Sequence, residues 1–429
     1  MSIKNKIISF FTNKPQILLY LFLPFYFALV FRLHKDSMEG DEQSYMYFAN
    51  NLINGYYSPE APDINLWHGP GYPMIVVFFL IFNIPFILIT LSNAIFQFLS
   101  VMFLYYSIKK MSNSFFAIFF AIFWGFNFMA YQEMPMILSE SFSVLLVTLI
   151  IYFLVLIHKT YKLIYLLILG FLLGYLALTK VIFGYVILCM IFLYSFIALK
   201  TTKNYKSIYI LFLALLINSP YLYYTNSLTG NYFYWGNSGG NLLYWMSTPH
   251  EGEYGDWNNN SFTANCNGYY ANFCNSDLIR KNHQNDIKYI ESLPKVRQDL
   301  AYKKIAFENI INQPIKFLKN IGSNFSRLLF NFPFSYSLQR ESTIIRIMIN
   351  SFVLIIMIIN FILFLVFFKR INSSFLFLNL LFYFYISLTL ILSASNRQFN
   401  IVIPIILFNF VIFLKHINKS RLVSNLFRF

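Results

Sequence analysis

The chain has few charged residues. Only 11% of its 429 residues are charged, whereas 58% are hydrophobic and 21% are aromatic. In an ordinary soluble domain about 25% of residues are charged, so the composition excludes that class and indicates a polytopic membrane protein. We find no fixed-period repeat and no low-complexity linker. We therefore expect one membrane domain with an outer cap.

Several functional motifs are also missing. The sequence contains no P-loop and no GxGxxG in the required setting, so a nucleotide donor is not indicated. The six His residues are scattered and form no HExxH or equivalent, which leaves a metal site built by the protein alone without support. A loop rich in carboxylates can still recruit a divalent cation together with water, so Mg or Mn bridging a donor phosphate stays open as a cofactor.

Cysteine is scarce, with three residues in the chain. Cys266 and Cys274 lie eight residues apart in a polar segment, and Cys189 lies in an apolar run. An extracytoplasmic location of the polar segment favours a structural disulfide between the first two. We expect no thiol chemistry.

Acidic residues are the scarcer of the two charge types. There are 17 Asp and Glu against 32 Lys and Arg, which gives a net charge of +15. The basic residues lie in short clusters between apolar runs, which is the pattern of membrane topology and not of nucleic-acid binding. A nucleic-acid partner is therefore not expected.

Apolar runs recur along the whole chain. A membrane span takes about 20 apolar residues. The candidates are 16–31, 73–107, 114–131, 140–157, 162–179, 181–199, 207–224, 343–368, 372–393 and 398–414. The run 73–107 is long enough for two short helices, with a possible break at Asn83 and Pro85.

The basic loops decide the topology. If 73–107 makes one net crossing, Lys109-Lys110 and the other short basic loops lie on the side of the amino terminus, which the positive-inside rule makes cytoplasmic. All 17 acidic residues then lie outside or at the outer membrane boundary. We therefore expect an all-α polytopic membrane protein with about ten net crossings and both termini in the cytoplasm. The amino terminus is expected to be a retained signal anchor.

This topology divides the chain into three parts. Residues 1–222 form an N-terminal transmembrane module with a first outer loop, 32–72; residues 223–342 form an extracytoplasmic cap of mixed structure; and residues 343–429 form the C-terminal helices. Within the cap, residues 295–319 have apolar side chains at helical spacing. This spacing predicts an amphipathic helix that lies on the membrane or on the other outer loop.

The first outer loop gathers six carboxylates, Asp36, Glu39, Asp41, Glu42, Glu60 and Asp63. Asp41 and Glu42 precede apolar residues at helical spacing, so the pair is expected to head a short amphipathic helix at the membrane surface. A partly desolvated carboxylate there has a raised basicity and can accept a proton from an acceptor hydroxyl. We predict Asp41 as the general base and Glu42 as a residue that orients it or binds substrate. The alternative is a solvated acidic turn.

Three further charged residues lie at outer ends of apolar runs. Glu140 begins one run, where it is either functional or only complements the helix dipole. Lys180 and Arg397 are the only charges of their runs, against the positive-inside bias. They are either interface anchors or the two cations that a lipid phosphate or pyrophosphate would need. His68 precedes Gly-Pro-Gly-Tyr-Pro, where it is a structural polar residue, a ligand or an acid.

The motifs in this order resemble the GT-C class of glycosyltransferases, in particular the branch related to protein O-mannosyltransferases and lipid A aminoarabinose transferases. The matching pieces are Asp41-Glu42-x-x-Tyr45, Pro70-Gly71-Tyr72-Pro73, Leu138-Ser139-Glu140, Gly170-x-x-x-Gly174 with Leu178-Thr179-Lys180, Ser219-Pro220-Tyr221, and Arg397 with Pro404. The resemblance spans residues 1 to about 415. It implies catalytic roles for Asp41, Glu42 and Glu140, and substrate binding by Tyr45, His68, Tyr72, Lys180 and Arg397.

The resemblance also implies a reaction and a place. An inverting transferase of this class would move a sugar from a polyprenyl-phosphate donor to a lipid-linked glycan or protein acceptor, on the extracytoplasmic face of a bacterial inner membrane. An O-antigen ligase or polymerase is an alternative, which would need its essential cations in a large late loop. A polyprenyl-linked lipid transporter or flippase is another, but such proteins place ionisable residues near the bilayer midplane, and here the apolar runs hold no acid in their interiors.

Overall fold

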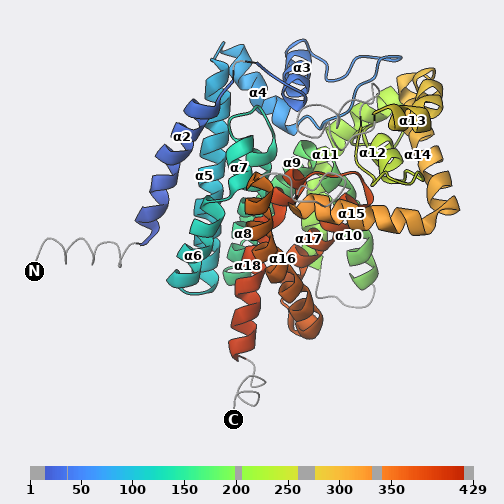
Figure 1. The fold of residues 1–429 in the computed structure, drawn as a ribbon. Coiled ribbons are helices and arrows are strands. Elements are labelled where there is room, and N and C mark those ends of the chain that lie inside the picture. The colour runs from blue at the N-terminus through green and yellow to red at the C-terminus, as the bar shows by residue number, and fades with distance from the viewer. Residues whose placement is uncertain (1–14, 36, 199–204, 259–275, 331–340, 420–429) are drawn as a thin grey trace, which may run out of the picture.

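The structure is a computed structural model that describes residues 15–35, 37–198, 205–258, 276–330 and 341–419. Every regular element in these ranges is a helix (Figure 1). Cys266 and Cys274, the predicted disulfide pair, lie outside the described residues. The all-α class is therefore confirmed.

The first half of the chain alternates long apolar helices with short ones. In order these are η1 (Pro15–Leu21), α2 (Phe22–Leu33), α3 (Asp41–Ile53), α4 (Gly71–Ile81), α5 (Phe86–Met111), α6 (Ser114–Gly125), α7 (Phe128–Glu133), α8 (Glu140–Lys159), α9 (Leu163–Thr179), α10 (Ile182–Ala198) and α11 (Tyr205–Thr229). α11 continues past residue 223, where we expected the cap to begin.

The second half begins with short helices and ends with long ones. These are α12 (Gly239–Met246), α13 (Ser276–Glu291), α14 (Lys295–Asn312), α15 (Pro314–Phe330), α16 (Glu341–Phe367), η4 (Phe368–Arg370), α17 (Ser373–Ile391) and α18 (Asn396–Lys419). We call α12 to α15 the cap. α3 and the cap lie toward the end of the bundle opposite the carboxyl terminus (Figure 1).

The number of apolar passes agrees with the sequence. Eight helices of the described residues are long and apolar enough to cross a membrane. α9 and α10 are shorter, at 17 residues each, and are apolar. With them the number of passes reaches about ten, as expected.

The run 73–107 is broken where the sequence suggested. α4 ends at Ile81 and α5 begins at Phe86, and between them Asn83 has a positive φ of 49°. The 11 residues of α4 extend about 16 Å, well short of the roughly 30 Å hydrocarbon core. α4 and α5 together therefore supply one helix of spanning length, as one net crossing requires.

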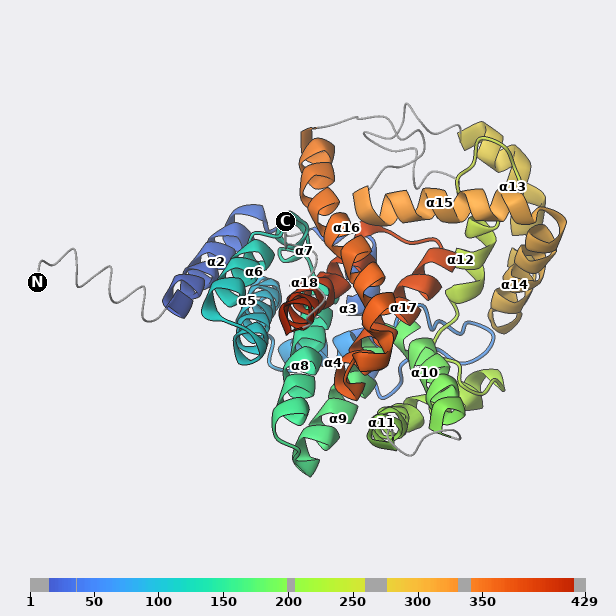
Figure 2. The same cartoon turned by 90° about the horizontal axis from the view of Figure 1, so that it is seen from below.

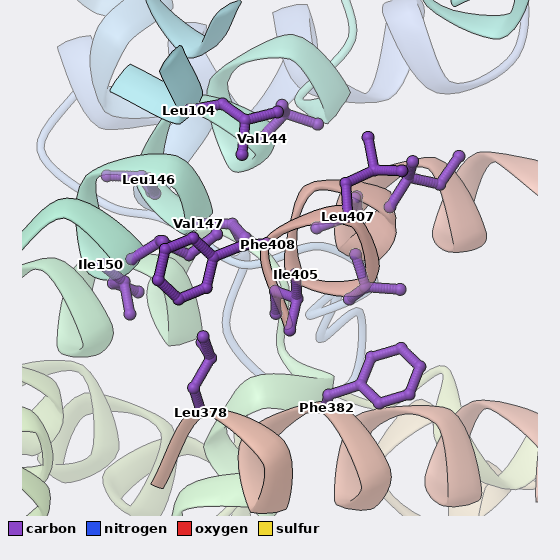
Figure 3. Close-up of a cluster of buried hydrophobic side chains, with 14 of the residues drawn as sticks. Leu104, Val144, Leu146, Val147, Ile150, Leu378, Phe382, Ile405, Leu407 and Phe408 are labelled. Carbon is purple, nitrogen blue, oxygen red and sulfur yellow. The ribbon is translucent and has the colours of Figure 1, made fainter. Parts of the chain in front are cut away.

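The core lies between α5, α8, α17 and α18. Figure 3 shows Val147 and Ile150 of α8 facing Phe408 of α18, with Leu378 of α17 close by, and all four are buried. Seen from below, α18 lies beside α8 and near the middle of the long helices (Figure 2). Because lipid tails are as apolar as these side chains, close packing and not water exclusion stabilises the helix contacts.

Close packing depends on glycine where α9 meets α11. A Cβ at Gly170 would lie 2.6 Å from the side chain of Leu213, and one at Gly174 would lie 2.8 Å from the carbonyl oxygen of Ala214. Small residues four apart let two helix backbones approach. This contact fixes α9, and with it the position of Lys180 at its carboxyl end.

The predicted amphipathic helix at 295–319 is two helices, α14 and most of α15, separated at Gln313. α14 packs Tyr302 and Ala306 against α12. A row of apolar side chains faces away from the protein and is 52–76% exposed: Leu300, Phe307, Ile311, Ile315 and Leu318. We call this row the apolar ridge. α15 lies across the direction of the spanning helices (Figure 1).

Candidate active site

The first turn of α3 presents Asp41 and Glu42 in different directions. Gly40 precedes the helix with a φ of 57°, a conformation that favours glycine, and turns the chain into it. The carboxylate of Glu42 is buried and accepts hydrogen bonds from the backbone nitrogens of Ile137, at 2.8 Å, and Glu39, at 3.3 Å. Glu42 therefore braces α3 against the segment before α8, which favours the orienting role among the two that we predicted for it.

Asp41 faces the amino terminus of α18. The Nη2 atom of Arg397 donates a hydrogen bond of 2.7 Å to Asp41 Oδ2. Burial raises the pKa of Asp41, but the guanidinium of Arg397, helped by His68 and Lys180, outweighs burial and holds the pKa below its ordinary value. The sequence had suggested a raised basicity; in this state the direction is the opposite, because the neighbouring cation dominates.

A second ion pair lies beside the first. Lys180 Nζ donates to Glu140 Oε1 at 2.9 Å, and Arg397 Nη1 lies 3.9 Å from the same oxygen. Glu140 therefore joins the two cations, and the four groups form a continuous chain from Asp41 to Lys180. The other carboxylate oxygen of Glu140 is buried and has no hydrogen-bond partner among the described residues.

His68 completes this wall of the site. Its Nε2 atom lies 3.7 Å from Asp41 Oδ1, and its ring stacks on Tyr45 with 4.5 Å between the centroids. Burial lowers the pKa of His68 to about 4, although the carboxylate of Asp41 acts in the opposite direction. The imidazole is therefore neutral near pH 7. Tyr45 is held in turn by a 2.7 Å hydrogen bond to the hydroxyl of Ser139.

The glycines after His68 place it against α9. A Cβ at Gly69 would lie 2.1 Å from the carbonyl oxygen of Leu178, and one at Gly71 would lie 2.4 Å from the hydroxyl of Thr179. Only glycine fits at either position, so the His-Gly-Pro-Gly turn brings His68 to the end of α9 where Lys180 lies.

Tyr72, which we predicted to bind substrate, is fully buried behind the site. Its hydroxyl donates to Asn93 Oδ1 at 3.1 Å, and Asn93 Nδ2 donates to the carbonyl of Met136 at 2.7 Å. The ring of Tyr72 lies edge-on to Tyr45, 5.1 Å away. Its position supports Tyr45 and offers no surface to a substrate.

The charged groups line a cavity of about 460 Å³ between the long helices and the cap. This volume is in the range of small-molecule sites. Asp41, His68, Glu140, Lys180 and Arg397 line it from the first outer loop and the long helices. Leu242, Asp256, Trp257 and Arg327 line it from the cap. We call this space the charged cavity.

Two buried charged residues near the cavity, Arg327 and Glu133, were not among the site residues predicted from the sequence. Arg327 of α15 donates to the carbonyls of Tyr254, Gly255 and Ala394, and pairs with Asp256 at 3.5 Å. Glu133 accepts a 2.8 Å hydrogen bond from Asn400. The polar face of α15 is a signal that could have pointed to Arg327, but its partners are far away in sequence.

The side chains of the site do not build a complete metal site by themselves. Among the described residues no three His, Cys, Asp or Glu groups gather as a metal site requires. Asp41 and Glu140 each face a protein cation instead.

Comparisons with known proteins agree with this architecture. Residues 68–224 match the family model described as dolichyl-phosphate-mannose-protein mannosyltransferase. No curated protein matches the chain. The fold is similar to that of an oligosaccharyltransferase from Archaeoglobus fulgidus, solved with a tethered acceptor peptide containing the NVT sequon, at a TM-score of 0.51 and 14% identity.

The structural match covers 98% of this chain and 52% of the oligosaccharyltransferase, so the chain spans about half the length of that protein. At this identity the match shows the fold alone. The family model covers the part of the chain that contributes His68, Glu140 and Lys180 to the charged cavity. The family model and the similar structure both belong to membrane glycosyltransferases of the GT-C class, the class that the sequence motifs also resemble.

Proposed function

We propose that the protein is an inverting glycosyltransferase that takes its sugar from a polyprenyl-phosphate donor and uses Asp41 as general base. The observation that supports this proposal is the meeting, in one cavity, of an ionised carboxylate with two cations from distant parts of the chain, Lys180 and Arg397. A solvated acidic turn would not bring these groups together.

The two cations suit a lipid phosphate. Arg397 offers a planar fork for two phosphate oxygens, and Lys180 adds a compact charge beside it. Glu140 Oε1 lies 2.9 Å from Lys180 Nζ and 3.9 Å from Arg397 Nη1, so Glu140 fixes the spacing between the two cations. Since two carboxylates already balance two cations, a bound phosphate has to compete with Asp41 and Glu140 for them.

The transfer itself needs one proton acceptor and one stabilised leaving group. The acceptor hydroxyl gives its proton to Asp41 while its oxygen forms a bond to the anomeric carbon of the donor sugar. The bond between that carbon and the phosphate oxygen breaks, and the lipid phosphate leaves with the electron pair. Lys180 and Arg397 stabilise the charge that develops on it. Attack opposite the leaving group inverts the anomeric configuration.

The contact between Asp41 and Arg397 links donor binding to base strength. When donor phosphate draws Arg397 away, the main influence that lowers the pKa of Asp41 is removed and burial, which raises it, remains. Asp41 thus becomes a stronger base when a donor is present. Because the donor has to bind before Asp41 becomes a strong base, Asp41 abstracts few protons in the enzyme without donor.

The site of action follows from the basic loops. The short loops at Lys109-Lys110 and after Lys159 lie at the end of the bundle away from α3 and the cap (Figure 1). By the positive-inside rule the charged cavity then faces the extracytoplasmic side. We place the protein in a bacterial inner membrane with both termini in the cytoplasm.

The proposal is tested with the purified full chain in lipid nanodiscs. Radiolabelled polyprenyl-phosphate sugars are added with a membrane extract, and label is followed from the donor lipid into product. We expect label in a new glycoconjugate whose anomeric configuration, determined by NMR, is opposite to that of the donor. Retention of configuration, or no consumption of any donor, would overturn the proposal.

A further inference from the structure

A second pocket opens next to the charged cavity. It has a volume of about 640 Å³ and lies between the first loop and the cap. Trp67 and Trp257 line both spaces, so the two are neighbours that share a wall. We call the second pocket the side pocket.

The lining of the side pocket is rich in neutral polar groups. Asn65, Asn237, Asn241 and Gln298 contribute amides, and Tyr47 contributes a 41% exposed aromatic ring. An amide group both donates and accepts hydrogen bonds, which matches the dual character of a sugar hydroxyl. Aromatic rings complement the apolar C–H faces of a sugar ring.

These amides hold the side chain of Trp257 and the backbone at Trp67. Trp257 Nε1 donates to Asn241 Oδ1 at 2.9 Å. The backbone nitrogen of Trp67 donates to Asn65 Oδ1 at 3.2 Å, and Asn237 exchanges two hydrogen bonds with the backbone of the neighbouring Leu66. The aromatic part of the pocket is therefore preorganised.

The wall formed by α14 is fixed as well. Asp299 is 2% exposed and accepts hydrogen bonds from the Tyr234 hydroxyl at 2.9 Å, the backbone nitrogen of Gly240 at 2.6 Å and Lys303 at 2.6 Å. A Cβ at Gly240 would lie 2.2 Å from the carbonyl oxygen of Asp299, so only glycine allows this approach of α12 to α14. A rigid polar pocket results.

The same lining argues against other ligands. Lys295 is the only Lys or Arg among the described lining residues, so the pocket lacks the cation cluster that a phosphate or a nucleic acid requires. Pro59 and Ile64 are the only purely aliphatic side chains among the described lining residues, too few to enclose a lipid tail. The described residues also contain no strand whose edge could pair with an extended peptide.

We infer that the side pocket binds the saccharide part of the acceptor, so that the acceptor is a glycan and not a peptide. This inference rests on the proposed transferase function: Trp67 and Trp257 border both spaces, so a glycan that extends past them from the side pocket enters the cavity that Asp41 lines. The glycan residue in the charged cavity receives the new sugar. The residues behind it occupy the side pocket.

The test measures binding without catalysis. The full chain in nanodiscs is applied to immobilised oligosaccharides and to immobilised peptides that contain Ser, Thr or Asn. The variants are Tyr47→Ala and Trp257→Ala, and the matched control is Tyr232→Ala. Tyr232 is 82% exposed and lines neither space, whereas Tyr47 lines only the side pocket.

We expect binding to a defined set of oligosaccharides that Tyr47→Ala and Trp257→Ala weaken by about tenfold each and Tyr232→Ala leaves unchanged. The inference would be overturned by peptide binding that depends on Tyr47. It would also be overturned by saccharide binding that neither Tyr47→Ala nor Trp257→Ala weakens, or by the absence of saccharide binding. Donor consumption is measured separately on the same samples. A protein that binds saccharide but consumes no donor contradicts the transferase proposal instead.

Discussion

Arg397 and Asp41 are 356 positions apart in the chain and share a hydrogen bond of 2.7 Å at the wall of the charged cavity. The contact joins α3, which lies within the first outer loop, to α18, the last helix of the bundle. The pKa of Asp41 therefore depends on whether Arg397 pairs with Asp41 or with the donor phosphate. The first prediction follows from this relationship.

Replacing Arg397 with Gln should shift the pH dependence of transfer. Arg397 lowers the pKa of Asp41, and a base must be ionised to act, so kcat/KM falls as pH falls through that pKa. Without the guanidinium the pKa rises, and the acidic limb of the kcat/KM profile should move to higher pH. An unshifted limb would mean that Asp41 is not the titrating base. The absolute rate should also fall, since the variant loses a phosphate ligand.

Lys180 should be needed for stability as well as for binding. Glu140 is 4% exposed, and removing Lys180 leaves this buried carboxylate without its nearest cation. Loss of one partner of a buried ion pair costs about 3–5 kcal/mol. We expect Lys180→Met to lower the unfolding temperature in detergent, and Lys180→Met with Glu140→Gln to recover most of the loss. If the double variant is as unstable as the single one, the pair does not act as we describe.

Glu42 should behave as a positioning residue. The amide oxygen of Glu42→Gln can still accept the hydrogen bond from Ile137, so this variant should keep most of the transfer rate and an unchanged pH profile. Glu42→Ala leaves the buried backbone nitrogen of Ile137 without a partner and should destabilise the protein by about 1–3 kcal/mol. Rates and thermal unfolding of both variants distinguish the roles. A Gln variant that folds normally but is inactive would make Glu42 a catalytic group.

The apolar ridge of α14 and α15 should lie in the membrane surface. Its side chains are exposed, and α15, which carries part of the ridge, lies across the direction of the spans as an interfacial helix does (Figure 1). A tryptophan introduced by Ile311→Trp should be quenched by brominated lipids. A tryptophan introduced by Asn285→Trp, on an exposed position of α13, serves as control and should be quenched less. Equal quenching of the two would place the ridge in water.

Local patterns predicted much of this arrangement. The spans and the break at Asn83 follow from hydropathy and turn residues, because lipid requires long apolar helices and turns favour few residue types. The positive-inside bias singled out Lys180 and Arg397, and Glu140 stood out at the start of its span. All three line one cavity together with Asp41 and His68.

Other features depend on contacts between distant segments. The direction of the Asp41 pKa is decided by Arg397, and the burial of Glu42 and Tyr72 is decided by the segment before α8. The side pocket exists only where the first loop meets the cap. The spacing of residues along the sequence does not determine how these distant elements are placed relative to one another. These features could therefore not be predicted from the sequence.

The central claim, that Asp41 is the base of a sugar transfer, is tested most directly by a pair of Asp→Asn variants. Asp41→Asn removes the proton acceptor but little volume, and Asp277→Asn makes the same change at an exposed position on α13, outside both pockets. Transfer from radiolabelled polyprenyl-phosphate sugar is measured beside donor binding. We expect Asp41→Asn to lower the transfer rate by about 10²–10⁴-fold while still binding donor, and Asp277→Asn to match the native protein. A native rate in Asp41→Asn would contradict the mechanism.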